Sequence, residues 1–455
     1  MDDAGSRGSS RVTESGLPGA IEQVGAFEST YMPRHDVDVT ETTRHDVRWR
    51  EDLALLGACG VRRVRYPVRW HRVERTGGVL DWRATDEVME HLSDGGFEPI
   101  VDLCHHTSYP RWIRSFADPA FGPAYLRFVA AFAERYPEVG AYTLFNEPFT
   151  TFLLCGQEGL WPPYHRGLSG MLDLARNVLP AVARASRLLR EVRPGARHVY
   201  VEACERHTSA GRRGDAMAAY ANDRRFFFTD LFVGRQVDPG PGRPFVADVL
   251  RAGGEDLLGM EPGHVDVLGL DYYAHNQWHW SGAHRGTTLS PSPVPLADVI
   301  VEYADRYRLP VMLGETNVRG FASDRATWFK YTLEQCERAR DAGVALDGYC
   351  WFPFIDSCDW DSLLARCDGR VDPVGVYWLD PGADLARRPS EMSEAYTMAA
   401  RGLPSTALPA YALRPPVSER LRGYLPHMDH WEWQPAPGAP APVEPPARRA
   451  ELRIP

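Results

Sequence analysis

At 455 residues the chain is longer than a single hydrophobic core usually allows, although a (β/α) barrel with long loops can hold that length as one domain. Its net charge of −10 offers no basic surface, so we expect neither a nucleic-acid nor a membrane partner. No stretch approaches the length of a membrane span, and residues 1–20 lack the apolar core of a signal peptide, so we expect a cytoplasmic protein.

The eight cysteines show neither a CxxC pair nor the ligand spacing of a zinc site, so we expect reduced thiols and no metal centre. Lys330 is the one lysine among 51 basic residues, a composition typical of a GC-rich bacterial genome. It lies within a helical pattern and not at a strand end, which argues against a Schiff-base mechanism. We expect no cofactor.

Segments rich in β-formers alternate with helical patterns along the chain. The predicted strands are 23–27, 61–68, 98–106, 142–147, 198–204, 265–273, 311–315 and 346–355. The predicted helices are 45–57, 81–93, 124–136, 170–192, 216–233, 296–307, 324–342 and 390–400. Eight strand-helix pairs predict an α/β fold, the closed (β/α)8 TIM barrel. A doubly wound open sheet is the alternative, but no GxGxxG or phosphate-binding loop follows any strand.

The composition divides the chain into three parts. Residues 1–19 are polar and predict a flexible arm, and residues 20–402 hold the predicted barrel. Residues 403–455 are rich in Pro, Ala and Arg and predict a tail, not a second domain. An aromatic patch at 427–433 is suited to docking this tail on the barrel.

Two apolar strands end in carboxyl groups. The segment TLFNEPFTT, Thr143–Thr151, places Asn146 and Glu147 side by side after a run of β-formers, and the strand at 311–315 ends in Glu315. An ionisable group at the end of a buried strand is unfavourable unless it is paired or used in chemistry. A structural ion pair and a catalytic role are both open for these groups at this point.

The carboxyl ends of all strands of a barrel meet at one face, so residues there share a pocket however far apart they are in sequence. An Arg, a His, a Tyr and an Asn around a pair of carboxyl groups can hold sugar hydroxyls and can separate two carboxyl pKa values. The strand-end residues are Glu28, Arg65, His105, His106, Asn146, Glu147, Asp271, Tyr273, Glu315, Asp356, Asp359 and Trp360.

Five segments resemble, in order, the motifs of glycoside hydrolase family 1, the retaining β-glucosidase family. TLFNEPFTT resembles T-x-N-E-P, and RYPVRWHR resembles the second-strand R-F-S-I-S-W-S-R. DLCHHTSYPRWI resembles L-Y-H-W-D-L-P-x-W-L, GLDYY resembles G-L-N-Y-Y, and GYCWFPFIDSCDW resembles G-Y-F-V-W-S-L-L-D-N-F-E-W. The resemblance covers about residues 20–400 and implies a divergent bacterial member of the family that acts on a small-molecule glycoside.

The resemblance also implies roles for individual residues. Glu147 would be the general acid/base and Glu315 the nucleophile, while Asn146 would bind the sugar 2-hydroxyl. Arg65 would hold and ionise Glu315, and Tyr273 would orient it. The remaining substrate-binding positions are His105, Glu28, Asp271, Phe352, Asp359 and Trp360.

The sequence departs from the family where the sugar is held. Glu28 stands in place of a Gln, Phe352 in place of a Trp and Asp359 in place of a Glu, and T-E-N-G becomes GETNV. These changes keep the bond-cleaving residues and alter the contacts to the glycone. We therefore expect an unusual sugar or the glycoside of a secondary metabolite.

Other interpretations remain open beside a retaining β-glycosidase. The same carboxyl pair would serve a transglycosidase, and a sugar-binding barrel that has lost catalysis is a further alternative. A metal-dependent hydrolase is disfavoured because the first strand has no His ligand. Arg65 has a structural interpretation as the partner of a buried carboxylate, and one of the adjacent His105 and His106 is expected to point away from the site.

Two geometric expectations follow from the resemblance. The peptide bond between Phe352 and Pro353 should be cis, because the family has a cis bond at this place. The carboxyl groups of Glu147 and Glu315 should lie about 5–5.5 Å apart, the spacing of a retaining pair.

Overall fold

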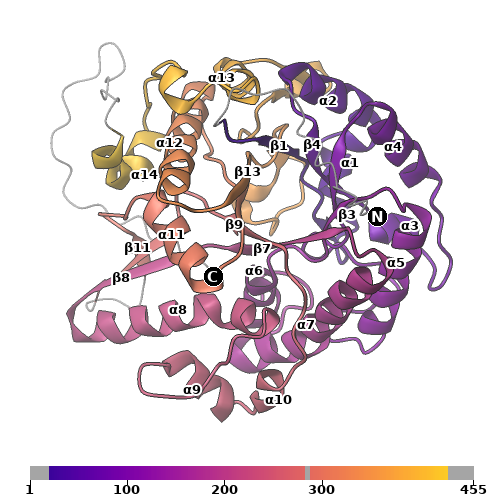
Figure 1. The fold of residues 1–455 in the computed structure, drawn as a ribbon, viewed down its shortest axis with the longest axis vertical. Helices are drawn as coiled ribbons and strands as arrows, with labels where there is room; N and C mark the ends of the chain where they lie inside the picture. Colours follow the sequence, from indigo (N-terminus) through magenta and orange to yellow (C-terminus); the bar gives the residue numbers. More distant parts are fainter. Residues whose placement is uncertain (1–19, 282–286, 429–455) are drawn as a thin grey trace, which may run out of the picture.

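The computed structural model describes residues 20–281 and 287–428, and its centre is a closed barrel of eight parallel strands (Figure 1). The barrel strands are β1 (Gln23–Ala26), β4 (Arg63–Pro67), β5 (Glu98–Asp102), β6 (Ala141–Thr143), β7 (Arg197–Ala203), β9 (Val267–Asp271), β12 (Val311–Glu315) and β13 (Leu346–Cys350). Their order around the barrel is β1-β13-β12-β9-β7-β6-β5-β4, so consecutive barrel strands are neighbours. The predicted (β/α)8 fold is confirmed.

A helix follows each barrel strand and packs on the outside of the barrel (Figure 1). These helices are α2 (His45–Cys59), α4 (Arg83–Asp94), α5 (Phe121–Arg135), α7 (Gly167–Val192), α8 (Gly211–Phe232), α11 (Leu296–Tyr307), α12 (Ala322–Asp341) and α13 (Glu391–Ala400). Their apolar faces form the larger core between the helices and the strands.

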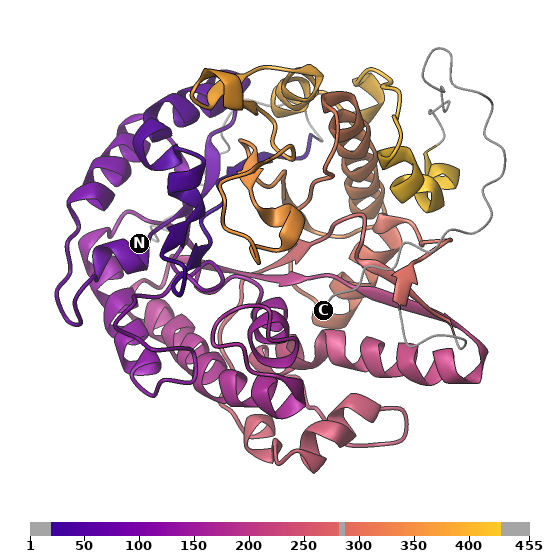
Figure 2. The ribbon, with the colours of Figure 1, turned by 180° about the vertical axis from the view of Figure 1, so that it is seen from behind.

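Shorter elements lie in the connections. The short helices are α1 (Val39–Thr42), α3 (Trp70–Val73), α6 (Pro148–Phe152), α9 (Pro244–Arg251), α10 (Glu255–Leu258) and α14 (Val417–Leu421), with a π-helix η1 at Leu153–Gln157. The antiparallel pairs are β2 (Tyr31–Met32) with β3 (Val37–Asp38), β14 (Ser357–Cys358) with β15 (Val371–Asp372), and β16 (Trp378–Asp380) with β17 (Ala386–Arg388). Figure 2 shows the segment after β13, in orange, in front of the barrel strands.

Alternate residues of each strand point into the barrel, where a small apolar cluster fills its lower part. The buried members of this inner cluster are Val24, Ala26, Ile100, Val199, Val201, Val267, Met312, Cys350 and Phe352. The same alternation turns Asp102, Asp271 and Arg65 inward at the strand ends. The apolar layer therefore closes the barrel beneath a polar layer.

A three-stranded sheet that we did not predict extends from the barrel beside α8 (Figure 1). It consists of β8 (Arg206–Ala210), β10 (Gln277–Ser281) and β11 (Thr287–Leu289), in the order β11-β10-β8. Because β8 follows β7 and β10 follows β9, this sheet continues from the strand ends that carry the polar layer.

Part of the predicted tail packs on the barrel helices. Tyr424 lies against Trp328 and Tyr331 of α12, and its hydroxyl is 2.8 Å from that of Tyr272. The predicted arm at 1–19 and all but the first two residues of the aromatic patch lie outside the described residues. Among the helices that the structure describes, none is both long and apolar enough to span a membrane.

Candidate active site

The Arg65 side chain joins three strand ends in the polar layer of the barrel. Its Nη1 donates to Oε1 of Glu315 at 2.5 Å, and its Nη2 donates to Asp102 Oδ2 at 2.7 Å and to Asn146 Oδ1 at 2.5 Å. Arg65 is 2% exposed, so these contacts are made out of bulk water. Although burial alone would lower the pKa of the guanidinium, the Asp102 and Glu315 carboxylates raise it above its usual value.

A local irregularity of β12 places Glu315 in the site. Met312 belongs to the inner cluster and Leu313 to the outer core, so strict alternation would turn residue 315 outward. The register with β9 shifts between Leu313 and Glu315, and bulges of this kind often redirect side chains near active sites. Glu315 Oε2 accepts a hydrogen bond from the Tyr273 hydroxyl at 2.7 Å, so each of its oxygens has a donor.

Glu147 occupies a left-handed backbone conformation, with φ of 42°, between the strand β6 and the helix α6. A non-glycine residue adopts this conformation at some energetic cost, and such residues cluster at functional sites. Pro148 starts α6 directly afterwards, which fixes the direction of the chain. His106, across the site, also has a positive φ, and its Nε2 lies 3.5 Å from Glu147 Oε2.

Three carboxyl groups converge at this point. One oxygen each of Glu147, Asp271 and Glu315 lie within 4.8 Å of one another, and all three residues are buried. Oxygens at this spacing could hold a divalent cation, because hard cations prefer carboxylate ligands. Without a cation, repulsion between them favours protonation of at least one group.

Burial and the charge of Glu315 raise the pKa of Glu147 well above its usual range. Burial and the charges of Glu315 and Glu147 have the same effect on the pKa of Asp271. A fourth carboxyl group lies behind Glu147: Glu202 accepts the backbone N–H of Phe149 at 2.8 Å, and burial raises its pKa to about 8. The arrangement therefore places Glu315, whose two oxygens each accept a hydrogen bond, beside carboxyl groups whose pKa values are raised.

Both histidines after β5 face the site, which corrects the expectation that one of them points away. The strand ends at Asp102, so strand alternation does not apply to residues 105 and 106. His105 Nδ1 lies 2.8 Å from Asp102 Oδ2, and His106 Nε2 lies 3.1 Å from Asn146 Nδ2. The sequence indicated a substrate-binding role for His105 and gave no role to His106.

The pKa values of the two histidines are shifted in opposite directions. Burial disfavours the charged form of His105, but the Asp102 and Glu28 carboxylates outweigh it and raise its pKa. Burial, together with the charges of His105 and Arg65, holds the pKa of His106 well below the usual value. His106 is thus the neutral imidazole beside Glu147.

Glu28 and Asp359 hold their own loops. Glu28 Oε1 accepts hydrogen bonds from Ser29 N, Thr30 N and Thr30 Oγ1 at 2.9, 2.8 and 2.7 Å. Asp359 accepts the backbone N–H of Gly369 at 2.7 Å and that of Arg370 at 3.1 Å, one on each oxygen. Glu28 Oε1 also lies 3.5 Å from His105 Nε2, which places it at the edge of the polar layer.

Two aromatic residues from the segment after β13 complete the surroundings. The Phe352 ring stacks on His105 with centroids 5.5 Å apart, and the bond from Phe352 to Pro353 is cis, as predicted. The Trp360 ring lies 5.8 Å from His106, and its buried Nε1 has no hydrogen-bond partner among the described residues.

Sequence reasoning missed Asp102, which pairs with both Arg65 and His105. The signal was available, because Asp102 stands four residues before His106 at the end of a strand rich in β-formers. Asp356, which the sequence placed among the strand-end residues of the pocket, has other partners. Its carboxylate accepts from Arg325 at 2.9 Å and from the backbone N–H groups of Gly375 and Leu379.

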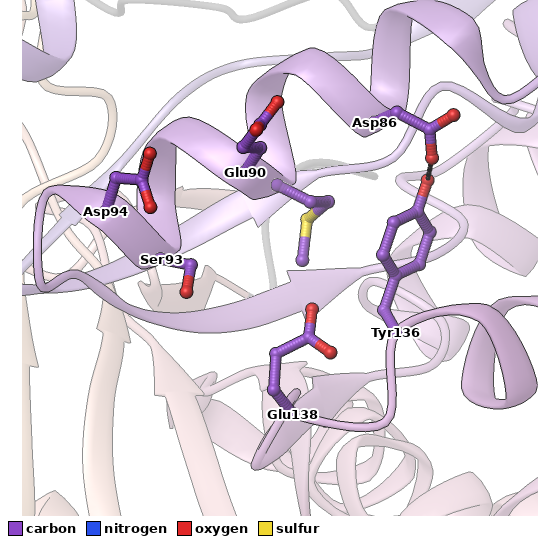
Figure 3. A pocket seen from close by; sticks show the side chains of 7 residues that line it. Asp86, Glu90, Ser93, Asp94, Tyr136 and Glu138 are labelled. Carbon is purple, nitrogen blue, oxygen red and sulfur yellow. Dashed lines mark hydrogen bonds between the residues drawn. The ribbon is translucent and has the colours of Figure 1, made fainter.

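Hollows also occur at the opposite end of the barrel. One lies between α4 and the segment after α5 and is lined by Asp86, Glu90, Asp94, Tyr136 and Glu138, with Tyr136 beside Asp86 at one edge (Figure 3). Tyr136 donates to Asp86 at 2.7 Å there. No predicted site residue lines this hollow, and its residues precede β5 and β6 instead of following them.

Comparisons with known proteins agree with this geometry. The profile of the family described as glycosyl hydrolase family 1 matches residues 27–279. Beta-glucosidase A of Thermotoga maritima is 22% identical over 380 residues, which are 74% of this chain and 82% of that protein. An aryl-phospho-beta-D-glucosidase of Bacillus subtilis is 23% identical over 248 residues, 50% of this chain and 51% of that protein.

Solved structures share the fold. The structure described as a family 1 β-glucosidase from Thermotoga maritima superposes with a TM-score of 0.71 at 17% identity, covering 86% of this chain and all of that one. A structure of the Thermotoga maritima β-glucosidase in complex with deoxynojirimycin gives a TM-score of 0.71 at 18% identity, with the same coverage.

Proposed function

Because this chain belongs to glycosyl hydrolase family 1, a family of retaining β-glycoside hydrolases, we propose that Glu315 is its nucleophile and Glu147 its general acid/base. The observation that carries the proposal is the pair of buried carboxyl groups with opposite surroundings. Glu315 has two donors that favour its anion, and Glu147 has a neighbouring anion that favours its acid form.

The spacing of the pair supports a covalent mechanism. A retaining pair of carboxyl groups lies about 5–5.5 Å apart, whereas an inverting pair needs about 6.5–9.5 Å to hold a water molecule. Oxygens of Glu147 and Glu315 lie within 4.8 Å of each other. This spacing is shorter than an inverting pair needs for a water molecule between its base and the sugar.

In the first step an oxygen of Glu315 attacks the anomeric carbon while the proton of Glu147 passes to the leaving oxygen. The bond to the aglycone breaks and an ester between Glu315 and the sugar forms. Arg65 and Tyr273 donate to the two oxygens of Glu315 and hold its carboxyl group for the attack.

Once the ester has formed, Glu147 changes from a general acid to a general base. The charge of Glu315 is one of the two leading causes of the raised pKa of Glu147, and ester formation removes that charge. The pKa of Glu147 falls, so its carboxylate can accept a proton from an incoming water. Water attacks the anomeric carbon, the ester bond breaks, and both carboxyl groups regain their starting states.

For the sugar, we propose a neutral or cationic glycone that differs from glucose in the groups that face Glu28 and Asp359. Oε1 of Glu28 and both oxygens of Asp359 already accept hydrogen bonds from their own loops, so these oxygens accept further hydrogen bonds in few directions. The polar layer holds more carboxyl groups than cations, which disfavours a phosphorylated glycone. The glycoside of a secondary metabolite and a cytoplasmic location are parts of the same proposal.

The proposal is tested with a 2-fluoro glycoside that carries a good leaving group. Fluorine slows breakdown of the intermediate more than its formation, so the protein should gain the mass of one fluorosugar on Glu315. A label on any other residue would overturn the assignment. If the 2-fluoro derivatives of all glycones that the enzyme cleaves fail to label the protein, a covalent intermediate is excluded.

The glycone is found by screening nitrophenyl β-glycosides, with 6-phosphoglycosides expected to be the poorest substrates. Failure of every glycone to react would favour a sugar-binding barrel without catalysis. Analysis of the products with added alcohols distinguishes hydrolysis from glycosyl transfer.

A further inference from the structure

Asp271 lies at the centre of the polar layer and is held there by the backbone around it. It is the last residue of β9 and is 0% exposed. Gly314, beside it on β12, leaves the space that its carboxyl group occupies, because a Cβ on Gly314 would lie 2.4 Å from Asp271 Oδ1. Any side chain at position 314 would displace the Asp271 carboxyl group from this place.

Asp271 differs from Asp102 and Glu315, two other buried carboxyl groups of the layer, in having no hydrogen-bond partner among the described residues. Neither of its oxygens has a hydrogen bond among the residues that the structure describes. Asp102 by contrast pairs with Arg65 and His105, and Glu315 accepts from Arg65 and Tyr273. A buried carboxyl group without a partner is unfavourable unless it is neutral or meets a ligand.

The charges around Asp271 favour its neutral form. One oxygen each of Glu315 and Glu147 lies within 4.8 Å of an Asp271 oxygen, and the charge of Glu202 on β7 also raises the pKa of Asp271. Arg65 on β4 is the one cation among the groups that act on it most strongly. Arg65 directs its donors to other residues. Of the three converging carboxyl groups, Glu315 has the donors that an anion needs, so the protons belong on Glu147 and Asp271.

We propose that Asp271 is a third active-site carboxyl group that works as a neutral acid, with its hydroxyl donating a hydrogen bond to the bound sugar beside the anomeric carbon and its carbonyl oxygen accepting one. This inference rests on the proposed function, because it places the sugar between Glu147 and Glu315. A neutral carboxyl group offers one donor and one acceptor, as the amide of Asn does. Asp271 stands where the family motif G-L-N-Y-Y has its Asn, so its protonated side chain can replace that amide.

The raised pKa of Asp271 supports this assignment, since burial and the neighbouring carboxylates both favour the proton. Loss of the proton would remove the donor to the sugar and would place a second negative charge beside Glu315. Catalysis should therefore require two protons on the free enzyme, one on Glu147 and one on Asp271.

The kinetic test uses Glu147→Gln and a nitrophenyl glycoside whose leaving group needs no proton. In this variant residue 147 no longer titrates. The loss of kcat/KM at high pH should therefore follow the deprotonation of a single group, Asp271. Asp271→Asn added to this variant should remove that loss, because the amide keeps one donor and one acceptor and does not titrate. Asp271→Ala, which offers neither donor nor acceptor, should lower kcat/KM about tenfold or more at every pH.

A spectroscopic test needs no substrate and separates this inference from the proposed function. In the infrared spectrum of the whole protein, a protonated carboxyl band should disappear in Asp271→Asn and persist in Asp102→Asn, a matched change at a paired carboxylate. The band of Glu147 should disappear separately in Glu147→Gln.

Three results would overturn the inference. The first is an infrared band of a protonated carboxyl group that Asp271→Asn leaves unchanged. The second is a loss of kcat/KM at high pH that Asp271→Asn leaves unchanged. The third is a collapse of kcat/KM in Asp271→Asn at every pH, which would mean that the carboxylate itself is needed. Dependence of the band or of activity on Ca²⁺ or Mg²⁺, tested with a chelator, would assign the three carboxyl groups to a cation instead.

Discussion

Arg65 on β4 and Glu315 on β12 are 250 residues apart, and yet the guanidinium donates directly to the carboxylate at 2.5 Å inside the closed barrel. The same guanidinium also holds Asp102 and Asn146. A single side chain therefore sets the position of the proposed nucleophile and of two strand ends beside it.

Replacing Arg65 with Met should leave the buried Glu315 carboxylate without its cation and Asp102 with His105 as its remaining partner. Removal of one partner of a buried ion pair typically destabilises a protein by about 3–5 kcal/mol, and we expect a loss of this size in the free energy of unfolding. Chemical denaturation measures it. Labelling of Glu315 by a 2-fluoro glycoside should also slow, even at temperatures where the variant is fully folded.

Arg63 offers a matched control on the same strand. It points into the opposite end of the barrel, where it pairs with Asp347 at 2.6 Å. Arg63→Met should lower stability and leave the labelling rate of folded protein close to that of the unchanged chain. Equal labelling rates in Arg65→Met and the unchanged protein would contradict the role given to Arg65.

Glu147→Ala should separate substrates by their leaving groups. General acid catalysis contributes about 10²–10⁴-fold, so kcat/KM should fall by about that factor for an alkyl glycoside and far less for a dinitrophenyl glycoside. Azide, a nucleophile that needs no general base, should accelerate turnover of the glycosyl-enzyme and give a glycosyl azide of retained configuration. A uniform fall across leaving groups would assign the acid to another residue.

The pH dependence of Glu147 follows from the sign of its shift. Glu147 acts as an acid in its protonated form, and its raised pKa keeps that form present above the pH at which an ordinary Glu ionises. Activity that needs the acid should therefore persist into that range and fall as pH rises through the pKa of Glu147. In the trapped glycosyl-enzyme the charge of Glu315 is gone, so NMR of labelled Glu carboxyl groups should show Glu147 titrating at lower pH. An unchanged titration would mean that Glu315 does not raise this pKa.

The fold could be predicted from the sequence because each repeated strand-helix pair is encoded in a short, continuous stretch of residues. Each strand-helix pair carries its own apolar pattern and its own end signals, so α11 and β12 have the predicted bounds. The strands at 98–106 and 142–147 were predicted too long at their carboxyl ends. There the chain leaves the strand ladder, and His106 and Glu147 take positive φ values that no apolar pattern indicates.

The members of the site and the contacts of Arg65 and Tyr273 with Glu315 could be predicted, whereas the contacts of Asp102 with Arg65 and His105 could not. The strand-end rule brought Arg65, Glu147 and Glu315 to one face, because barrel topology decides which ends meet. The register shift that turns Glu315 inward and the space beside Gly314 depend on contacts between strands distant in sequence. The same holds for the sheet of β8, β10 and β11, in which the paired strands β8 and β10 are separated along the chain by α8, α9, α10 and β9.

Glu28→Gln should alter the choice of glycone without altering the chemistry. Glu28 lies at the edge of the polar layer, 3.5 Å from His105 Nε2, and an amide can replace one carboxylate oxygen as acceptor while adding a donor. Gaining or losing one hydrogen bond to a hydroxyl group changes kcat/KM by about 2- to 10-fold, so the ratio between two glycones that differ at one hydroxyl should change by that factor. The same substitution at Glu22, which pairs with Arg63 at the opposite end of the barrel, is the control and should leave the ratio unchanged. Constant ratios across a panel of nitrophenyl glycosides in Glu28→Gln would place Glu28 outside the glycone site and leave it a loop residue that holds Ser29 and Thr30.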